Sequence, residues 1–161
     1  MERLKRLDVY KSLVPSKISS IKIVVEELIC NLNQRIGDLD EYILFELRVI
    51  LNELLVNAIR HGNRDDESKN IKVVAGIDEQ KDLFVSVEDE GCGYDFANTC
   101  DNLKPYCGEI DSLDVSECAE CGRGILIIKS LCDRVLVNDK GNKTVIHKRL
   151  LKARPEANQL L

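Results

Sequence analysis

Glu53 and Asn57 stand four residues apart in the largely apolar segment NELLVNAIRHG, residues 52–62. In a helix this spacing puts both side chains on one face, with their Cβ atoms roughly 5–6 Å apart. Glutamate can act as a general base, and asparagine offers a neutral oxygen ligand that suits Mg²⁺. Two interpretations follow from this stretch alone: a catalytic face that binds a metal, or a solvated helix edge.

A second candidate lies in VEDEGCGYD, residues 87–95, where Asp89, Gly91 and Gly93 follow an apolar run at D-x-G-x-G spacing. Glycine permits a ligand to approach the backbone closely, and a carboxylate can accept a hydrogen bond from an exocyclic amine. A purely structural turn can have the same composition. A calcium-binding EF-hand loop is excluded, because Cys100 occupies the twelfth position, where an acid is needed.

A third candidate is CGRGILIIKSL, residues 121–131, in which Gly122 and Gly124 flank Arg123 at the start of a helical pattern. The N-terminus of a helix offers unpaired N–H groups and the positive end of the helix dipole. Arg123 therefore favours phosphate binding over a junction that merely needs flexibility. The chain has no GxxxxGK[ST] phosphate loop and lacks the HRD and DFG signatures of ordinary protein kinases.

Helical and strand periodicities predict the elements that must position these motifs. The helix that carries Glu53 and Asn57 is expected to run from Asp38, which forms a capping-box-like start with Glu41, to about His61. Strands and helices are partly segregated along the chain. We therefore expect an α+β fold, a two-layer sandwich with helices on one face of a mixed, mostly antiparallel sheet. The expected strands are 7–13, 71–77, 83–88, 135–138 and 144–150; further helices are expected between Ser16 and Gly37 and at 124–132, and a long loop at 94–121.

The composition fits a single domain over residues 1–161, with 44% apolar and 32% charged residues. The net charge of −5 argues against a nucleic-acid partner, because phosphate backbones are bound by clustered Lys and Arg. The N-terminal MERLKRLDVYK lacks the apolar core of a signal peptide, and the run Ile125–Ile128 is too short to span a bilayer. We therefore expect a cytoplasmic protein with no membrane segment.

The chain has seven cysteines, an odd number that fits reduced thiols in the cytosol better than a secreted disulfide framework. Cys30 and Cys132 are expected in core helices as small hydrophobic side chains. Four further cysteines fall in the long loop, and four thiolates could bind structural Zn²⁺, although two tight pairs would form the stronger pattern. These loop cysteines are Cys100, Cys107, Cys118 and Cys121.

Taken in this order, the three motifs resemble the N, G1 and G2 boxes of the GHKL ATPases, a superfamily that includes gyrase, histidine kinases and MutL. Within it, the chain most closely resembles the small bacterial anti-sigma factor serine/threonine kinases, through NAIRHG, DEGCG, GRG and Thr144 near the start of the last strand. The resemblance extends from about Val9 to Leu150. It implies a Bergerat-type ATP-binding fold in which the loop 94–121 is the ATP lid, and this lid is longer and richer in cysteine than is expected of the family.

Carried over by position, the resemblance implies a role for each motif residue. Glu53 would be the general base and Asn57 the Mg²⁺ ligand. Asp89 would bind the adenine in a pocket shaped by Gly91 and Gly93. The other implied residues are Thr144 near the adenine, Gly122, Arg123 and Gly124 as the lid hinge against the triphosphate, and Arg60 near phosphate.

The resemblance further implies an anti-sigma regulatory factor that binds Mg·ATP and phosphorylates an anti-anti-sigma partner of the STAS type, which controls release of a sigma factor. It also implies a homodimer. Three alternatives stay open: a non-catalytic ATP-binding module that sequesters a sigma factor or another regulator, a detached histidine-kinase catalytic domain, and a thiol-based metal or redox sensor built on the lid cysteines.

Overall fold

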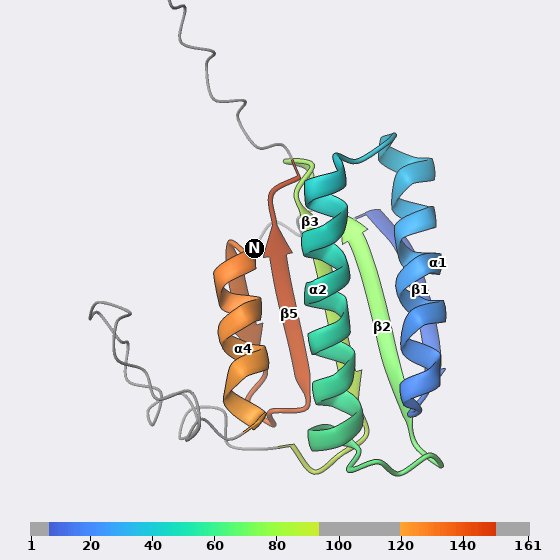
Figure 1. The fold of residues 1–161 in the computed structure, drawn as a ribbon, viewed down its shortest axis with the longest axis vertical. Coiled ribbons are helices and arrows are strands. Elements are labelled where there is room, and N and C mark those ends of the chain that lie inside the picture. The colour runs from blue at the N-terminus through green and yellow to red at the C-terminus, as the bar shows by residue number, and fades with distance from the viewer. Residues whose placement is uncertain (1–6, 94–119, 151–161) are drawn as a thin grey trace, which may run out of the picture.

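The structure, a computed structural model, describes residues 7–93 and 120–150. Within these residues a five-stranded sheet is covered on one face by helices, so the chain forms two layers (Figure 1). A short π-helical turn, η1, continues helix α2. The elements in chain order are β1 (Leu7–Pro15), α1 (Ile18–Ile36), α2 (Glu41–Asn57), η1 (Ala58–Gly62), β2 (Asn70–Ile77), β3 (Leu83–Asp89), α4 (Glu120–Leu131), β4 (Arg134–Val137) and β5 (Lys143–Lys148).

The strands lie in the order β1-β2-β3-β5-β4. The predicted α+β sandwich is confirmed, and the sheet, expected to be mostly antiparallel, is antiparallel at every described pairing. β3 is the central strand, and Glu88 near its end pairs with Lys143 at the start of β5. The D-x-G-x-G motif therefore leaves the sheet at its middle, directly beside the turn between β4 and β5.

The core lies between the sheet and the helices. The strands alternate as a half-covered sheet requires: Val73, Val85 and Ile146 are fully buried, whereas Lys72 on the other face is exposed. Helix α2 contributes a stripe of buried apolar side chains, each of which stabilises the fold by roughly 1.5–3 kcal/mol. This stripe, which fixes α2 against the sheet, includes Leu47, Ile50, Leu51, Leu54 and Leu55.

The start of α2 differs from the prediction. Asp40, not Asp38, is the N-cap, and its carboxylate accepts a hydrogen bond from the N–H of Tyr42 at 2.8 Å. The Asp38 cap is wrong because the capping side chain must stand directly before the first helical residue to reach the free N–H groups there. The predicted end of α1 is confirmed: Gly37 has φ +84°, a region that glycine adopts at little cost.

The predicted loop 94–121 ends earlier than expected, because α4 begins at Glu120. The remainder of this loop, 94–119, lies outside the described residues, and with it Cys100, Cys107 and Cys118. No helix in the described part of the chain is long and apolar enough to cross a membrane.

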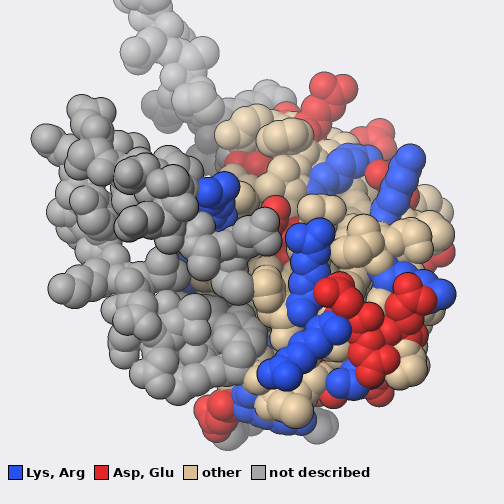
Figure 2. Space-filling model, turned by 60° about the horizontal axis from the view of Figure 1, so that its bottom comes forward, with Lys and Arg blue, Asp and Glu red and all other residues tan. Residues whose placement is uncertain are grey.

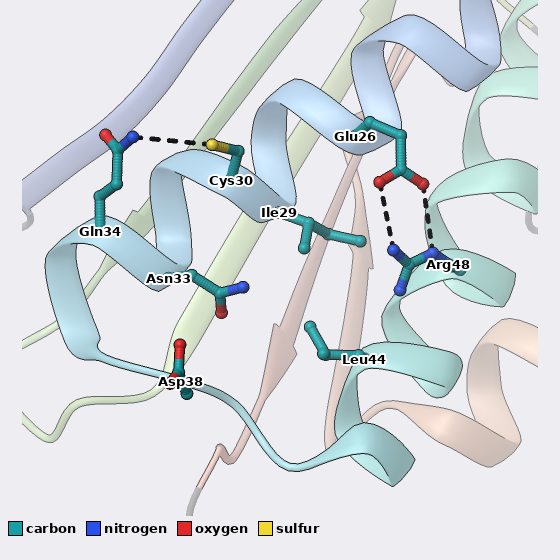
Figure 3. Close-up of a pocket in the computed structure, with 8 residues that line it drawn as sticks. All are labelled: Glu26, Ile29, Cys30, Asn33, Gln34, Asp38, Leu44 and Arg48. Atoms are coloured by element: carbon teal, nitrogen blue, oxygen red, sulfur yellow. Dashed lines mark hydrogen bonds and ion pairs between the residues drawn. The ribbon is translucent and has the colours of Figure 1, made fainter.

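The environment of Cys30 also differs from the prediction. Cys30 is exposed on α1, beside the groove between α1 and α2, where the Gln34 amide nitrogen lies 3.6 Å from its sulfur (Figure 3). The core face of this turn is formed by Leu28 and Ile29 instead, and the next position along a helix turns toward solvent. Cys132, directly after α4, is half-buried and packs against the core, as expected.

Candidate functional site

The C-terminal end of α2 is extended by a wider helical turn. The N–H of Asn63 donates to the carbonyl of Ala58 at 2.8 Å, a spacing of five residues instead of four. Such π turns are rare and frequently occur at functional sites. Here the turn directly follows Asn57, which is the last residue of α2, and it carries Gly62 toward the end of β3.

The first and third motifs meet where α4 crosses the end of α2. A Cβ atom at Gly124 would stand 2.6 Å from Glu53 Oε2, and 3.4 Å from both polar side-chain atoms of Asn57. Only glycine allows the backbone of α4 to approach these two side chains so closely. Glu53 and Asn57 are both half-buried, so they lie at the margin of the core with their polar groups directed at α4.

The second motif meets the same helix a few residues later. A Cβ atom at Gly62 would overlap the carboxylate of Asp89, and one at Gly91 would overlap the carbonyl oxygen of Gly62. The close approach of the η1 backbone to the end of β3 therefore brings the first and second motifs together. All three motifs converge at the C-terminal end of α2 and η1.

Asp89 is a buried carboxylate, 8% exposed. Burial raises its pKa above the ordinary value, because the charged form loses hydration, and the N–H of Gly91, which donates to Asp89 Oδ1 at 2.9 Å, partly offsets this. A desolvated acceptor gains strongly from a ligand that donates a hydrogen bond to it. The group is therefore suited to bind an N–H donor such as an exocyclic amine.

Two buried asparagines hold the Asp89–Gly91 turn in place. Asn63 is fully buried; its amide donates to the carbonyl of Asn70 at 3.0 Å and its oxygen accepts the N–H of Glu90 at 2.9 Å. From the other side, the side-chain amide of Asn142 donates to the main-chain carbonyl of Asp89 at 3.0 Å, and the main-chain carbonyl of Asn142 accepts the Asp89 N–H at 2.9 Å. Sequence reasoning missed both residues, because an asparagine next to a glycine is equally typical of any exposed turn.

Gly93 and Thr144 lie at the β4–β5 side of this turn. Gly93 has φ +78°, and a Cβ atom there would overlap the carbonyl of Lys140. Thr144 pairs with Val87, two residues before Asp89, and so it lies on the same face of the sheet as Asp89. The structure thus places both predicted residues next to the turn that carries Asp89.

Gly122, Arg123 and Gly124 lie within the first two turns of α4, not before the helix. Arg123 is exposed. Figure 2 shows the face at which α2 ends; in its described part, Lys and Arg side chains lie beside a group of Asp and Glu side chains.

Arg60 lies apart from this cluster. It is exposed in η1 and lines a groove of about 470 Å³ between α1 and α2, together with Lys22 and Val56. Because α2 lies between α1 and α4 (Figure 1), this groove is on the opposite side of α2 from Gly124. A regular helix would return Arg60 to the face of Glu53, but the wider π turn shifts the positions after Asn57 around the axis.

The predicted zinc ligands gain no support from the described residues, which contain no group of three or more His, Cys, Asp and Glu that could hold a metal ion. Cys100, Cys107 and Cys118 lie outside these residues, and Cys121 belongs to α4. The side-chain oxygen of Asn57 suits a hard cation such as Mg²⁺.

Residues 8–148, from β1 to β5, match the histidine kinase-like ATPase domain family. The chain therefore belongs to this family, and the resemblance drawn from the three motifs is confirmed.

Among curated proteins, the chain is similar to serine-protein kinases and to an anti-sigma factor. It is 30% identical to the serine-protein kinase RsbW of Bacillus subtilis (strain 168) over 100 residues. This aligned region covers 62% of this chain and 60% of that protein. It is 29% identical over 110 residues to the anti-sigma F factor of Clostridium perfringens, which covers 66% of this chain and 73% of that protein. The chain therefore spans about two thirds of the length of these relatives.

A solved structure has the same fold. The crystal structure of the RsbU and RsbW domains of Rv1364c from Mycobacterium tuberculosis superimposes with a TM-score of 0.56, at 16% sequence identity, over 88% of this chain and 32% of that one. At this identity the likeness concerns the fold alone.

Proposed function

We propose that the chain is an ATP-dependent serine/threonine protein kinase of the anti-sigma type. The observation that carries the proposal is the convergence of the three motifs: Gly124 lies against Glu53 and Asn57, while Gly62 lies against Asp89. The proposal is supported by the names of the relatives, a serine-protein kinase and an anti-sigma F factor.

The donor groups at the site fit a magnesium nucleotide. Asp89 offers a buried acceptor for the adenine amine, next to Gly91 and Gly93. Asn57 would hold Mg²⁺ through its side-chain oxygen, and Arg123 would contact the phosphates. When bound, Mg·ATP would supply the phosphoryl group and the cation that neutralises its oxygens.

Glu53 is the candidate general base. Its carboxylate would accept the proton of a serine or threonine hydroxyl of the protein substrate as that oxygen becomes the nucleophile. The close contact with Gly124 restricts where this carboxylate can lie. Phosphoryl transfer depends mostly on positioning and electrostatics, so one base and a fixed nucleotide suffice.

The substrate and partners that we propose follow from the relatives. The phosphorylated protein would be an anti-anti-sigma protein of the STAS type, and the sequestered protein would be a sigma factor. Neither partner is a nucleic acid, in keeping with the net charge of −5.

A homodimer is part of the proposal, and the open face of the sheet is the candidate interface. No described helix covers this face (Figure 1). Val74, Ser86, Val145 and Leu136 stand on it in one cross-strand row, and Leu13 is 65% exposed. A row with three apolar side chains of this kind can pair with its own copy across a two-fold axis. Light scattering of the wild type and of Val145→Glu tests this: a dimer that the substitution dissociates is expected, and a wild-type monomer contradicts it.

The decisive experiment incubates the protein with labelled ATP, Mg²⁺ and candidate STAS-domain proteins. We expect label on a serine or threonine of one of these proteins. Binding of Mg·ATP by calorimetry without transfer to any candidate would favour the non-catalytic ATP-binding module. No heat and no thermal shift with Mg·ATP would contradict the proposal as a whole.

A further inference from the structure

A buried ion pair joins α2 to the last strand, away from the motifs. Glu46 of α2 and Lys148 of β5 are 5% and 4% exposed, and Lys148 Nζ lies 2.7 Å from Glu46 Oε2. Lys148 occupies an inward position of β5, in register with the fully buried Leu83, where strand alternation favours an apolar residue. A buried ion pair is often no more stabilising than apolar residues of the same volume, so stability alone does not explain it.

Lys148 also binds the end of α4. Its Nζ donates to the main-chain oxygen of Leu131 at 2.7 Å. Leu131 is the last residue of α4, so this carbonyl has no hydrogen-bond partner inside the helix. The ammonium group there also meets the negative end of the helix dipole. Lys148 thus connects the C-terminus of α4 to Glu46.

The thiol of Cys132, near Lys148, is not the negative partner of this lysine. Burial is the largest cause that raises the pKa of Cys132, to about 11, so its thiol is neutral near pH 7. The counter-charge of Lys148 is therefore the carboxylate of Glu46.

Glu46 and Leu131, which Lys148 connects, lie on the same faces of α2 and α4 as Glu53 and Gly124 do. Glu46 precedes Glu53 by seven residues, and Gly124 precedes Leu131 by seven. Seven residues are about two turns, roughly 10 Å along the axis, and return to the same face. The helices run in opposite directions (Figure 1). The position of α4 relative to α2 is therefore fixed at two points. At one, Gly124 packs against Glu53; at the other, Lys148 binds both the Leu131 carbonyl and the Glu46 carboxylate.

We infer that Glu46 and Lys148 are positioning residues that set the height and angle of α4 over α2 and thereby hold Gly124 against Glu53 and Asn57. For its effect on the nucleotide, the inference rests on the function proposed above. Both residues act through the backbone of α4 and not by contact with the ligand. An apolar pair could fill the same space, but it could not bind the Leu131 carbonyl, and apolar contacts alone do not fix a direction.

The test replaces both charges by apolar groups of similar volume, Glu46→Leu together with Lys148→Met. We measure hydrogen exchange of the α4 amides without nucleotide, and the Kd of Mg·ATP by calorimetry. We expect the variant to fold, with amides 125–131 exchanging about tenfold faster while those of α1 keep their rates. We expect the Kd to rise about tenfold, because a small displacement of positioning groups weakens a site strongly.

The matched control removes an exposed ion pair of the same helix. Arg48 of α2 and Glu26 of α1 are 3.2 Å apart at the surface (Figure 3). Glu26→Gln together with Arg48→Gln also removes one negative and one positive charge, but on the side of α2 away from α4. We expect wild-type exchange in α4 and a wild-type Kd for this control.

Each outcome bears on the inference. A folded apolar variant with wild-type exchange or a wild-type Kd overturns it, since the ion pair would then be at most structural. If that variant does not fold, Glu46→Gln, which keeps the bond from Lys148 to Leu131, is judged by the same two measurements. If the wild type itself does not bind Mg·ATP, the proposed function is wrong, and the exchange of α4 alone decides on the positioning role.

Discussion

Gly124 of α4 lies so close to Glu53 of α2 that a Cβ atom at residue 124 would stand 2.6 Å from Glu53 Oε2. This contact joins two motifs that are far apart in the sequence, and it leaves the Glu53 carboxylate little freedom on that side. The position of the candidate base thus depends on the absence of one methyl group.

Gly124→Ala should therefore reduce phosphoryl transfer without unfolding the protein. Alanine is a better helix former than glycine by about 1 kcal/mol, which offsets part of the crowding. We expect transfer to fall about tenfold or more as Glu53 is displaced, with a Tm close to that of the wild type. Leu126→Ala, at an exposed position two residues later, is the control and should leave transfer unchanged. Full activity of Gly124→Ala would show that the contact does not position Glu53.

Glu53→Gln should separate chemistry from binding. The amide keeps the shape of the side chain but cannot accept the proton, so transfer should fall by about a hundredfold or more. Calorimetry should still detect Mg·ATP with a similar Kd. Glu41→Gln, in the first turn of the same helix, is the control for loss of a negative charge from α2. Normal transfer by Glu53→Gln would assign the base elsewhere.

Asp89→Asn should weaken nucleotide binding. The loss of a charged acceptor for the adenine amine should raise the Kd of Mg·ATP about tenfold to a hundredfold. Asp139→Asn, an exposed change of the same kind in the β4–β5 turn, should leave the Kd unchanged. An unchanged Kd in Asp89→Asn would rule out this carboxylate as the adenine acceptor.

The same variant should become more stable than the wild type as pH rises. Burial raises the pKa of Asp89 in the folded state above its ordinary value of 3.8. Its contribution to stability is fully present below pH 3.8 and is lost as pH rises through the folded pKa. Asparagine does not ionise, so the Tm of ligand-free Asp89→Asn should match the wild type at low pH and exceed it near pH 7. A difference that does not vary with pH would contradict this.

Asn63→Ala tests whether Asn63 supports the Asp89–Gly91 turn. It leaves the Glu90 N–H and the Asn70 carbonyl without their partner, and the side chain is fully buried, so we expect a loss of about 2 kcal/mol or more in unfolding free energy. Denaturant titration measures this loss, and calorimetry should show a higher Kd for Mg·ATP. Asn138→Ala would remove bonds to Asn142 and to the first residue of β5, Lys143, but Asn138 is exposed, so this variant should cost less. Equal, small losses in both variants would deny Asn63 this role.

Local patterns in the sequence predicted the elements well. The strands and helices formed where periodicity placed them, and the glycine after Ile36 ends α1 as expected. The errors lie where an offset of one or two residues decides the outcome. Asp40 replaces Asp38 as the cap of α2, and Cys30 faces solvent one position beyond the core residue Ile29. The expected place of Arg60 near phosphate stays a prediction; Arg60 lines the groove between α1 and α2 after a π turn, which a regular helical repeat does not predict.

The sequence by itself determined which side chains are the candidates for the chemistry, because each residue type acts through its own atoms and the spacing within each motif is local. Only the tertiary structure decided that these groups share one place, that Asp89 is desolvated, and that Asn63, Asn142 and Lys148 hold the surrounding backbone. The reason is physical: burial and contact are created when separate elements pack, and a pattern of near neighbours does not encode them.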